Sequence, residues 1–294
     1  VDIDLKNLNL NIEDLVAKIT KKTKAVMCVH ILGLCTNMDE LRKICKQKNL
    51  ILFEDTCESL GSKYNNIKLG NFGEFGTYSF YYSHQITSGE GGMVVCKNLE
   101  DYNILKSLRS HGWSRDTKFH NFYKKKFKNI DEKFLFINSG YNLRPLDVTA
   151  AIANNQYKRL NKFINIRKKN RNLIIKTIKK NKRWNNQFLF FESNKKIKPS
   201  WFGLPILINK KINFKRKKFI EHLNKSKIEN RPIVSGNFLN QPAIKLYKLN
   251  SKGSFKNADL VQKSGFFIGL HTVELSQSKV NHIAEKLLDI DHIK

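Results

Sequence analysis

Short apolar runs alternate with an amphipathic segment near the start of the chain. Lys24–Ile31 (KAVMCVHI) is an apolar run typical of a buried parallel strand, and Leu50–Phe53 (LILF) is a second one. Between them, apolar residues recur at helical spacing from position 38 to position 45, after Thr36 or Asn37 as N-cap. Strand, helix and strand within about 30 residues predict a right-handed βαβ unit and therefore a parallel sheet.

Two further strands are predicted around a turn in the middle of the sequence. Phe75–Tyr82 and Gly92–Cys96 have strand patterns, and a polar turn with His84 and a glycine pair joins them. Residues 99–111 look helical, whereas residues 114–138 are polar, basic and poorly periodic. We expect residues 114–138 to form a long surface excursion, a kind of segment that is often functional.

A change of pattern divides the chain. From Pro145 a helical pattern runs into a basic helix near Phe163–Lys180, which we expect to bridge two domains. Short strands are predicted at Phe188–Phe191, Trp201–Ile208 and near Ile228–Ile233, and a helix at Phe214–Asn224. Helices near Ala243–Lys248 and Asn257–Ser264 flank loops, and a final helix starts at about Ser276. We predict an α/β protein, with residues 1–155 in a large, mainly parallel-sheet domain. Residues 156–294 would form the bridging helix and a small C-terminal α+β domain.

Composition restricts the class of protein. The 294 residues are 40% apolar, which indicates a globular chain, and no run of about 18 uncharged apolar residues predicts a membrane span. The five cysteines are odd in number and lack a C-x-x-C pair. This pattern argues against a disulfide framework, a zinc ribbon and an iron–sulfur site. It favours reduced thiols and a cytoplasmic location.

The net charge of +29 raises the question of a nucleic-acid partner. The lysines are scattered along the chain, and we find no zinc-finger spacing, RNP-like strand or compact recognition helix. We therefore favour a solvated basic surface, and predict neither a nucleic-acid nor a membrane partner. The same charge would attract an anionic substrate.

Candidate chemistry gathers around the predicted turn. Asp55 ends a strand where ligands bind in open α/β sheets, although an N-cap role explains it as well. The hydroxyls around the turn, Ser79 among them, could cradle a phosphate, although an ordinary strand–turn–strand also accounts for them. His84 has no companion ligand nearby except Glu90, which argues against a metal and leaves a general base as its natural role. The residues alone indicate a site for a phosphorylated ligand, with an unknown reaction.

Three segments together carry a family resemblance. They are EDTCESLG (Glu54–Gly61), GNFGEFGTYSFYYSHQITSGEGG (Gly70–Gly92) and GYNLRPLD (Gly140–Asp147). In this order they resemble the DegT/DnrJ/StrS-type sugar aminotransferases, which use pyridoxal 5′-phosphate (PLP) and act on nucleotide-linked keto-sugars. The resemblance covers essentially the whole chain. It implies the type I, aspartate aminotransferase-like fold and a homodimer with active sites shared at the interface.

One departure from the family pattern is informative. His84 stands where family aminotransferases carry the lysine that forms the internal Schiff base. This substitution resembles the sugar 3-dehydratases, and SFYYSHQ, SHGWSRD, PSWFGLPI and RPIVSGNFL resemble those that act on GDP-4-keto-6-deoxymannose. The related branch with a [2Fe–2S] cluster carries clustered cysteines, which residues 114–138 lack. The resemblance thus implies C3 deoxygenation of a nucleotide-linked 4-keto-6-deoxy sugar, in deoxysugar and O-antigen biosynthesis. PLP and pyridoxamine 5′-phosphate would be the cofactor forms, and L-glutamate the amino donor.

The resemblance also implies a role for individual residues, and it implies no metal. His84 would be the catalytic base, Asp55 would pair with the pyridine nitrogen, and Glu58 would lie near the ring's 3-oxygen. Ser79 would bind the cofactor phosphate, and Asn142 would bind the phosphate of the partner subunit's cofactor. Arg115 and Arg231 would bind anionic groups of the substrates.

Other interpretations stay open at this point. In the family, a phosphate-cupping glycine/serine loop and a ring-stacking aromatic precede the segment equivalent to Val1. We therefore expect either that an amino-terminal part is missing from the sequence or that the natural protein is a remnant that binds the cofactor poorly. The chain could instead be a sugar aminotransferase that uses another lysine, such as Lys63 or Lys68. It could also be a non-catalytic remnant that binds a sugar nucleotide or nucleic acid.

Overall fold

Two four-stranded sheets organise the part of the chain that the computed structural model describes, residues 1–247, 249 and 253–293. Positions 248, 250–252 and 294 of the predicted second part lie outside the described residues. The α-helices are α1 (Ile12–Lys18), α2 (Met38–Gln47), α3 (Leu99–Leu108), α4 (His120–Lys126), α5 (Asp147–Tyr157), α6 (Leu160–Lys180), α7 (Arg216–Lys225), α8 (Lys256–Ser264) and α9 (Gln277–Leu288). The 3₁₀ helices are η1 (Ile31–Gly33), η2 (Glu132–Phe134), η3 (Phe238–Asn240), η4 (Pro242–Leu246) and η5 (Asp289–His292). The strands are β1 (Ile3–Asp4), β2 (Asn9–Leu10), β3 (Ala25–Val29), β4 (Ile51–Asp55), β5 (Lys63–Tyr64), β6 (Ile67–Lys68), β7 (Phe75–Ser79), β8 (Gly92–Cys96), β9 (Phe188–Phe190), β10 (Ile197–Lys198), β11 (Gly203–Ile208), β12 (Asn230–Arg231) and β13 (Gly265–Gly269).

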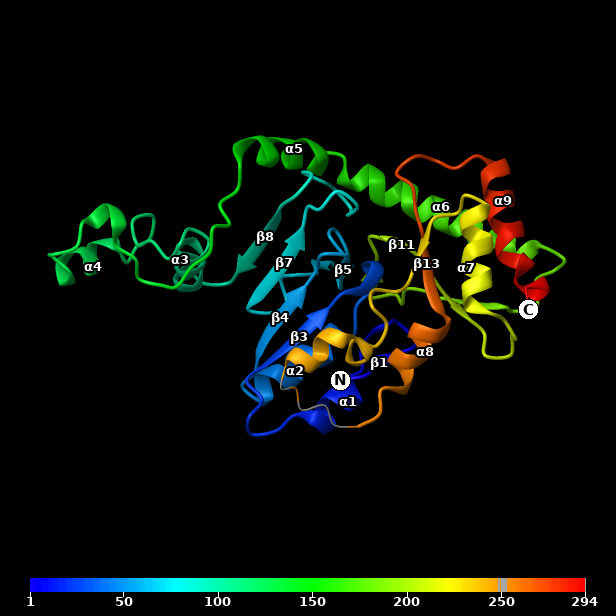
Figure 1. The fold of residues 1–294 in the computed structure, drawn as a ribbon, viewed down its shortest axis with the longest axis horizontal. Coiled ribbons are helices and arrows are strands. Elements are labelled where there is room, and N and C mark those ends of the chain that lie inside the picture. Colours follow the sequence, from blue (N-terminus) through cyan, green and yellow to red (C-terminus); the bar gives the residue numbers. More distant parts are fainter. Residues whose placement is uncertain (248, 250–252, 294) are drawn as a thin grey trace.

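The first sheet has the strand order β3-β4-β7-β8 and contains the predicted strand–helix–strand unit (Figure 1). β3, β4 and β7 are parallel, and β8 returns antiparallel to β7. α2 begins after Asn37, whose side chain accepts the backbone N–H of Glu40 as an N-cap. Met38, Leu41 and Cys45 are buried on the face of α2 that the helical spacing predicted. These elements confirm the mainly parallel sheet.

The strand that leads into the central turn is shorter than its apolar pattern predicted. β7 ends at Ser79, whereas we predicted a strand to Tyr82. Beyond Ser79 the backbone N–H of Phe80 donates to the carbonyl of Gly91, and the carbonyl of Phe80 accepts from the N–H of Ser88, both at 2.9 Å. The turn between β7 and β8 is therefore closed by its own backbone hydrogen bonds.

The second sheet has the strand order β12-β13-β11-β9, and all of its pairs are antiparallel. One of its inner strands, β13, was not predicted: the sequence pattern assigned no strand between the helix near Asn257–Ser264 and the final helix from about Ser276. The GFFIG run is too short and too uniformly apolar to show strand alternation. Only the pairing of Ile268 with Leu204 and of Phe266 with Ile206 identifies it as a buried strand.

Two apolar cores accompany the two sheets. The core around the second sheet includes buried residues of α6, α7 and α9. Leu8, Leu32 and Leu34 come from the part of the chain that forms the first sheet, yet they pack into the core of the second sheet. Residues near the start of the chain therefore help to form the core of the second sheet, and the division into residues 1–155 and 156–294 stays a prediction.

The predicted bridging helix is α6, which continues from α5 towards the second sheet (Figure 1). It begins at Leu160, ahead of the predicted Phe163, and buries Ile174 and Ile178 while its charged residues largely face outward. Such a helix is amphipathic, which fits packing on one side against a core. Within the described ranges, no helix is both long and apolar enough to cross a membrane.

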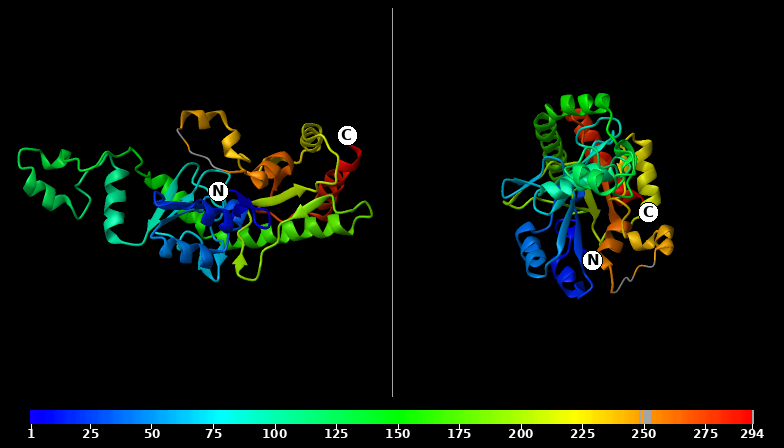
Figure 2. Two further views of the ribbon diagram at one scale, coloured as in Figure 1. Left: turned by 90° about the horizontal axis from the view of Figure 1, so that it is seen from below. Right: turned by 90° about the vertical axis from the view of Figure 1, so that its left-hand side faces the viewer.

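A long arm, residues 109–146, extends away from the first sheet between α3 and α5 (Figures 1 and 2). The excursion predicted at residues 114–138 lies in this arm, but it includes α4 and η2, which its weak periodicity did not reveal. Backbone bridges from Ser110 to Asn142 and from Trp113 to Phe136 hold the two lengths of the arm together.

Replacing Phe266 with alanine is expected to lower the free energy of unfolding by about 3–5 kcal/mol, as for other buried phenylalanines. The ring is fully buried in β13 and lies 5.9 Å from the ring of Phe219 in α7, so its removal leaves a cavity in the larger core. Urea denaturation measures the loss. Leu189→Ala, on β9 and 51% exposed, is the control and should cost no more than about 0.5 kcal/mol. Equal costs for the two variants would contradict the core position of β13.

Candidate active site

The carboxyl ends of β4 and β7 meet at one edge of the first sheet, directly before the central turn. Asp55 is the last residue of β4 and lies beside Thr77 of β7 in the parallel register. Because side chains alternate along a strand, Asp55, Thr77 and Ser79 point to the same face of the sheet. Ligands bind at such edges in open α/β sheets, so one ligand could reach the carboxylate and both hydroxyls.

His84 lies in the turn that follows this edge and is half-buried between aromatic rings. Its backbone N–H donates to the carbonyl of Tyr81 at 3.0 Å. The imidazole meets the Tyr81 ring edge-on at 5.9 Å and the Phe202 ring at 5.4 Å between centroids. Its Nδ1 atom is buried and has no hydrogen-bond partner among the described residues. The ring is thus oriented by packing, and its buried Nδ1 atom is left without a hydrogen bond from the described part of the chain.

The surroundings of His84 suit a base. Burial lowers the pKa of the imidazole below its ordinary value of 6.5, and the negative charge of Asp55 partly opposes this shift. The ring is therefore neutral near neutral pH and can accept a proton. The effect of Asp55 on the His84 pKa also indicates that the fold brings these two predicted groups together.

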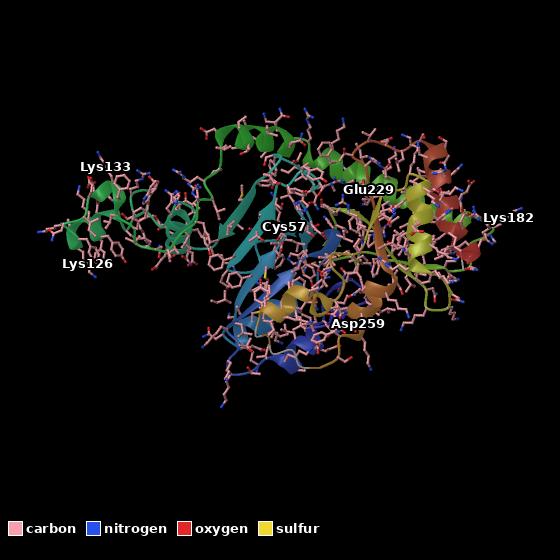
Figure 3. The ribbon with its side chains drawn as sticks, in the orientation of Figure 1. Cys57, Lys126, Lys133, Lys182, Glu229 and Asp259 are labelled. Carbon is pink, nitrogen blue, oxygen red and sulfur yellow. The ribbon has the colours of Figure 1, made fainter. Side chains whose placement is uncertain are left out.

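Asp55 makes the capping contact that its sequence position suggested, and its role towards a ligand stays a prediction. One carboxylate oxygen accepts the backbone N–H of Cys57 at 3.0 Å, a capping contact for the turn that follows β4. Burial and the neighbouring Asp55 carboxylate raise the pKa of the Cys57 thiol to about 12. Cys57, labelled near the centre of Figure 3, is therefore an unreactive thiol.

Glu58 and Gln85 lie deeper in the same region. Glu58 accepts the backbone N–H of Leu32 at 2.9 Å. Burial raises the pKa of its carboxyl and Asp55 adds to the rise, while the bond from Leu32 opposes it. Gln85 donates to the carbonyls of Glu58 and Ser200 and thereby ties the central turn to two distant segments. Sequence reasoning missed Gln85, whose only signal was its place beside His84.

Ser79 ends β7 directly before the central turn, and Arg231 of β12 lies near Tyr82 in that turn. The Ser79 hydroxyl accepts the backbone N–H of Tyr81 at 3.2 Å. Arg231 forms an exposed ion pair with Glu229 at 2.9 Å, and Glu229 and the nearby Tyr82 raise the pKa of its guanidinium. Although 147 positions separate Arg231 from His84 in the numbering (231 − 84), the fold brings its guanidinium to the edge of the turn.

Arg115 and Asn142 lie in the arm and not beside His84. The Arg115 guanidinium stacks on the Trp113 ring, 3.7 Å from its centroid, and Asn142 is exposed and bridges Ser110 through the backbone. Lys126 and Lys133, at the tip of the arm, are far from Cys57 in Figure 3. Within one chain, the fold does not bring Arg115 and Asn142 to the candidate site.

The two lysines considered as alternative Schiff-base residues lie on the β5–β6 hairpin. Lys63 is in β5, which pairs with β10, and Lys68 is in β6. Lys68 donates to the hydroxyl of Tyr157 in α5 at 3.3 Å. Both belong to a three-stranded sheet separate from the one that carries Asp55.

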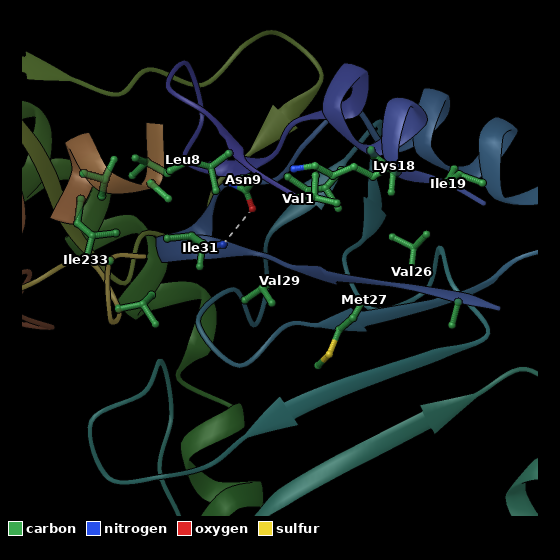
Figure 4. Close-up of a pocket in the computed structure, with 18 of the residues that line it drawn as sticks. Val1, Leu8, Asn9, Lys18, Ile19, Val26, Met27, Val29, Ile31 and Ile233 are labelled. Atoms are coloured by element: carbon green, nitrogen blue, oxygen red, sulfur yellow. Dashed lines mark hydrogen bonds between the residues drawn. The ribbon is translucent and has the colours of Figure 1, made fainter. Parts of the chain in front are cut away.

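A separate hollow of about 420 Å³ lies near the start of the chain (Figure 4). Its lining is mainly apolar and includes Val26, Met27 and Ile233, and in it Asn9 accepts the backbone N–H of Ile31 at 3.1 Å. None of the predicted site residues lines it. We therefore place the candidate site at the carboxyl edge of β4 and β7 and not in this hollow.

Comparison with known proteins identifies relatives over nearly the whole chain. GDP-4-keto-6-deoxy-D-mannose 3-dehydratase of Escherichia coli O55:H7 is 39% identical over 290 residues, which cover 98% of this chain and 73% of the relative. The enzyme of the same name from Yersinia pseudotuberculosis is 36% identical over 284 residues, which cover 96% of this chain and 71% of the relative.

Solved structures agree with the sequence relatives. The E. coli GDP-4-keto-6-deoxy-D-mannose-3-dehydratase with bound hydrated PLP superimposes with a TM-score of 0.87 at 38% identity, covering 98% of this chain and 73% of that one. The predicted type I aminotransferase-like α/β fold is thereby confirmed. The model of the DegT/DnrJ/EryC1/StrS aminotransferase family matches residues 1–288. The chain therefore belongs to the DegT/DnrJ/EryC1/StrS aminotransferase family.

Proposed function

We propose that the protein is a PLP- and pyridoxamine phosphate-dependent 3-dehydratase of a nucleotide-linked 4-keto-6-deoxy sugar, with L-glutamate as amino donor. The observation that carries this proposal is His84, a half-buried imidazole with an unpartnered nitrogen beside Asp55. It stands where the aminotransferases of the family have their Schiff-base lysine. GDP-4-keto-6-deoxymannose is the substrate we propose, because the relatives with 39% and 36% identity carry that name. A solved structure of a GDP-4-keto-6-deoxymannose-3-dehydratase holds a trapped PLP-glutamate geminal diamine.

The residues at the carboxyl edge fit this cofactor. A carboxylate at Asp55 suits a protonated ring nitrogen, and the Ser79 hydroxyl on the same face suits a phosphate oxygen. Burial raises the pKa of the Glu58 carboxyl above its ordinary value, and Glu58 is our candidate for the group near the 3-oxygen of the cofactor ring. When bound, PLP supplies an electron sink for the carbon that loses a proton.

In this proposal His84 moves the protons. Its neutral ring accepts a proton from carbon, and the imidazolium that results returns one to the departing C3 hydroxyl. A histidine suits both directions because its pKa lies close to the working pH. Tyr81 and Phe202 hold the ring from two sides and keep water from part of it. A histidine cannot replace the lysine as the covalent anchor, which directs the chemistry away from ordinary transamination.

We also propose that the arm serves a second copy of the chain. Arg115 and Asn142 were assigned to substrate and cofactor phosphate, but within one chain they lie in the arm that leaves the first sheet (Figure 1). A homodimer in which each arm reaches the partner's site would bring Arg115 and Asn142 to a ligand.

All five cysteines are free, which suits the reducing cytoplasm. The proposal includes neither a nucleic-acid nor a membrane partner.

The direct test combines the full-length protein with PLP, glutamate and GDP-4-keto-6-deoxymannose. Formation of a 3-deoxy-4-keto sugar nucleotide with release of ammonia is the expected result. A 4-amino sugar with its C3 hydroxyl intact would overturn the dehydratase proposal. Borohydride reduction in the presence of PLP separates the aminotransferase alternative, because only an internal Schiff base would leave labelled Lys63 or Lys68.

Replacing Arg231 with glutamine is expected to raise the KM for glutamate or for the sugar nucleotide by about 10- to 100-fold with little change in kcat. The estimate follows from the loss of one charged hydrogen bond to an anionic group. Steady-state kinetics with each substrate varied in turn shows which one Arg231 binds. Lys225→Gln, at the end of α7, removes a cation of the same domain and should leave both KM values unchanged. Equal effects of the two variants would indicate a general effect of charge.

A further inference from the structure

Glu54 is buried directly beside Asp55, on the opposite face of β4. Its carboxylate lies against the loop formed by residues 70–73 and accepts three backbone hydrogen bonds from it. The donors are the N–H groups of Gly70 at 2.8 Å, Phe72 at 2.6 Å and Gly73 at 2.7 Å. A carboxylate with this many donors is held in one orientation.

His30 holds Glu54 from the other side. Its Nε2 atom lies 2.9 Å from the Glu54 carboxylate, and both side chains are completely buried. The backbone N–H of His30 donates to the carbonyl of Asp55 at 2.9 Å. The hydroxyl of Ser59 in turn donates to the carbonyl of His30 at 2.7 Å. One residue of the neighbouring segment therefore bonds both the side chain of Glu54 and the main chain of Asp55.

Their pairing favours the charged form of both partners. Burial alone would lower the pKa of His30, but Cys28 and Glu54 raise it to about 9. Burial alone would raise the pKa of Glu54, but its bonds to His30 and to the 70–73 loop lower it. Removing either partner leaves a buried charge unpaired, so the local structure would have to move to reach water or another partner.

We infer that Glu54 is a positioning residue for Asp55: it fixes the end of β4 from the opposite face, and His30 holds it in place. The inference rests on the proposed function, in which Asp55 pairs with the cofactor ring. Neighbouring residues on a strand point to opposite faces, so a rotation of the strand end that displaces Glu54 also turns Asp55. The 70–73 loop packs tightly against this sheet, because a side-chain carbon at Gly76 would lie 2.2 Å from the carbonyl oxygen of Gly70. That close approach seats the loop directly on β7.

The test is Glu54→Gln in the full-length protein, with two readouts that do not depend on turnover. The amide keeps the shape of the side chain but turns an NH₂ group towards N–H donors. We expect the Kd for PLP, measured by absorbance titration, to rise about 10- to 100-fold, as when the partners that orient a metal ligand are removed. The absorption band of the bound cofactor should also change at a lower pH than in the unaltered protein. A displaced Asp55 would stabilise the protonated ring nitrogen less.

Glu74→Gln is the matched control. Glu74 also accepts a backbone N–H of β4, that of Leu52 at 2.7 Å, but on the part of the strand away from Asp55. If Glu54 acted only on stability, the two variants would differ only in their unfolding temperature. We expect Glu74→Gln to leave both PLP readouts unchanged even where it lowers that temperature.

Each outcome decides the inference. A folded Glu54→Gln variant with unchanged Kd and an unchanged band overturns it while the proposed function stands. Should Glu54→Gln not fold, His30→Gln keeps a donor towards Glu54 without the charge and should shift both readouts in the same direction. A folded His30→Gln variant that shifts neither readout overturns the inference as well. If the unaltered protein shows no saturable PLP binding, the proposed function fails, and this inference fails with it.

Discussion

Replacing His84 with asparagine is expected to lower kcat for C3 deoxygenation by about 10²–10⁴-fold, the usual contribution of a positioned general base. Asparagine fits the space between Tyr81 and Phe202 but cannot take up a proton at neutral pH. The Kd for PLP should change little, because His84 is not among the residues assigned to hold the cofactor. Steady-state kinetics and absorbance titration measure the two quantities. Loss of PLP binding together with activity would indicate a structural role instead.

The pH dependence gives a second check on His84. Burial holds the pKa of His84 below 6.5, and a protonated imidazole cannot act as a base, so kcat should fall on the acid side at a pH below that value. This acid limb should disappear in His84→Asn. It should persist in the control His271→Asn, which alters an exposed histidine of the segment after β13. An acid limb centred above 6.5, or one that survives in His84→Asn, would contradict the assignment.

Replacing Asp55 with asparagine is expected to lower kcat by about 10²–10³-fold, the range for removing one preorganised electrostatic group from an active site. The amide can still accept the N–H of Cys57, so the turn after β4 should keep its shape. What it loses is the negative charge that favours a protonated ring nitrogen. Kinetics measures the loss of rate, and the pH at which the bound cofactor's band changes measures the loss of charge.

Asp101→Asn in α3 is the control for this change of charge, because Asp101 lies in a helix outside the candidate site. It should leave the rate and the band unchanged. The effect on His84 provides an independent readout: without the Asp55 charge, which raises the His84 pKa, the acid limb of kcat should move to lower pH. A limb that moves to higher pH would show that the two groups do not interact as the structure indicates.

Much of the candidate site could be predicted because its parts follow one another closely along the chain. Asp55 ends a strand whose apolar run is visible in the sequence, and β7, the central turn and β8 are consecutive. Parallel strands must present their carboxyl ends at one edge, so the meeting of Asp55 with Ser79 and His84 follows from the order of elements. The resemblance of these motifs to the PLP-dependent sugar aminotransferases and 3-dehydratases then suggested the reaction, which the spacing of the residues alone did not.

The parts that were missed depend on contacts between distant segments. β13 is an apolar run of five residues, and only its pairing with β11 distinguishes it from a buried loop. Gln85 has no pattern at all, and its bonds to Glu58 and Ser200 exist only once three segments are packed together. Glu54 adjoins Asp55 in the sequence, but the donors that hold it come from residues 30 and 70–73.

By itself the sequence determined the mainly parallel sheet, the place of Asp55 at its carboxyl edge and the substitution of a histidine for the family's lysine. These are local properties: a strand's apolar run, a helix cap and a residue type are set by neighbours a few positions away. Only the tertiary structure decided that Arg231 reaches the central turn, that Arg115 and Asn142 leave it in an arm, and that His30 and Glu54 form a buried pair beneath Asp55. Such contacts depend on how separate elements pack, because burial and partners, which fix a side chain's charge and direction, come from residues far away in the chain.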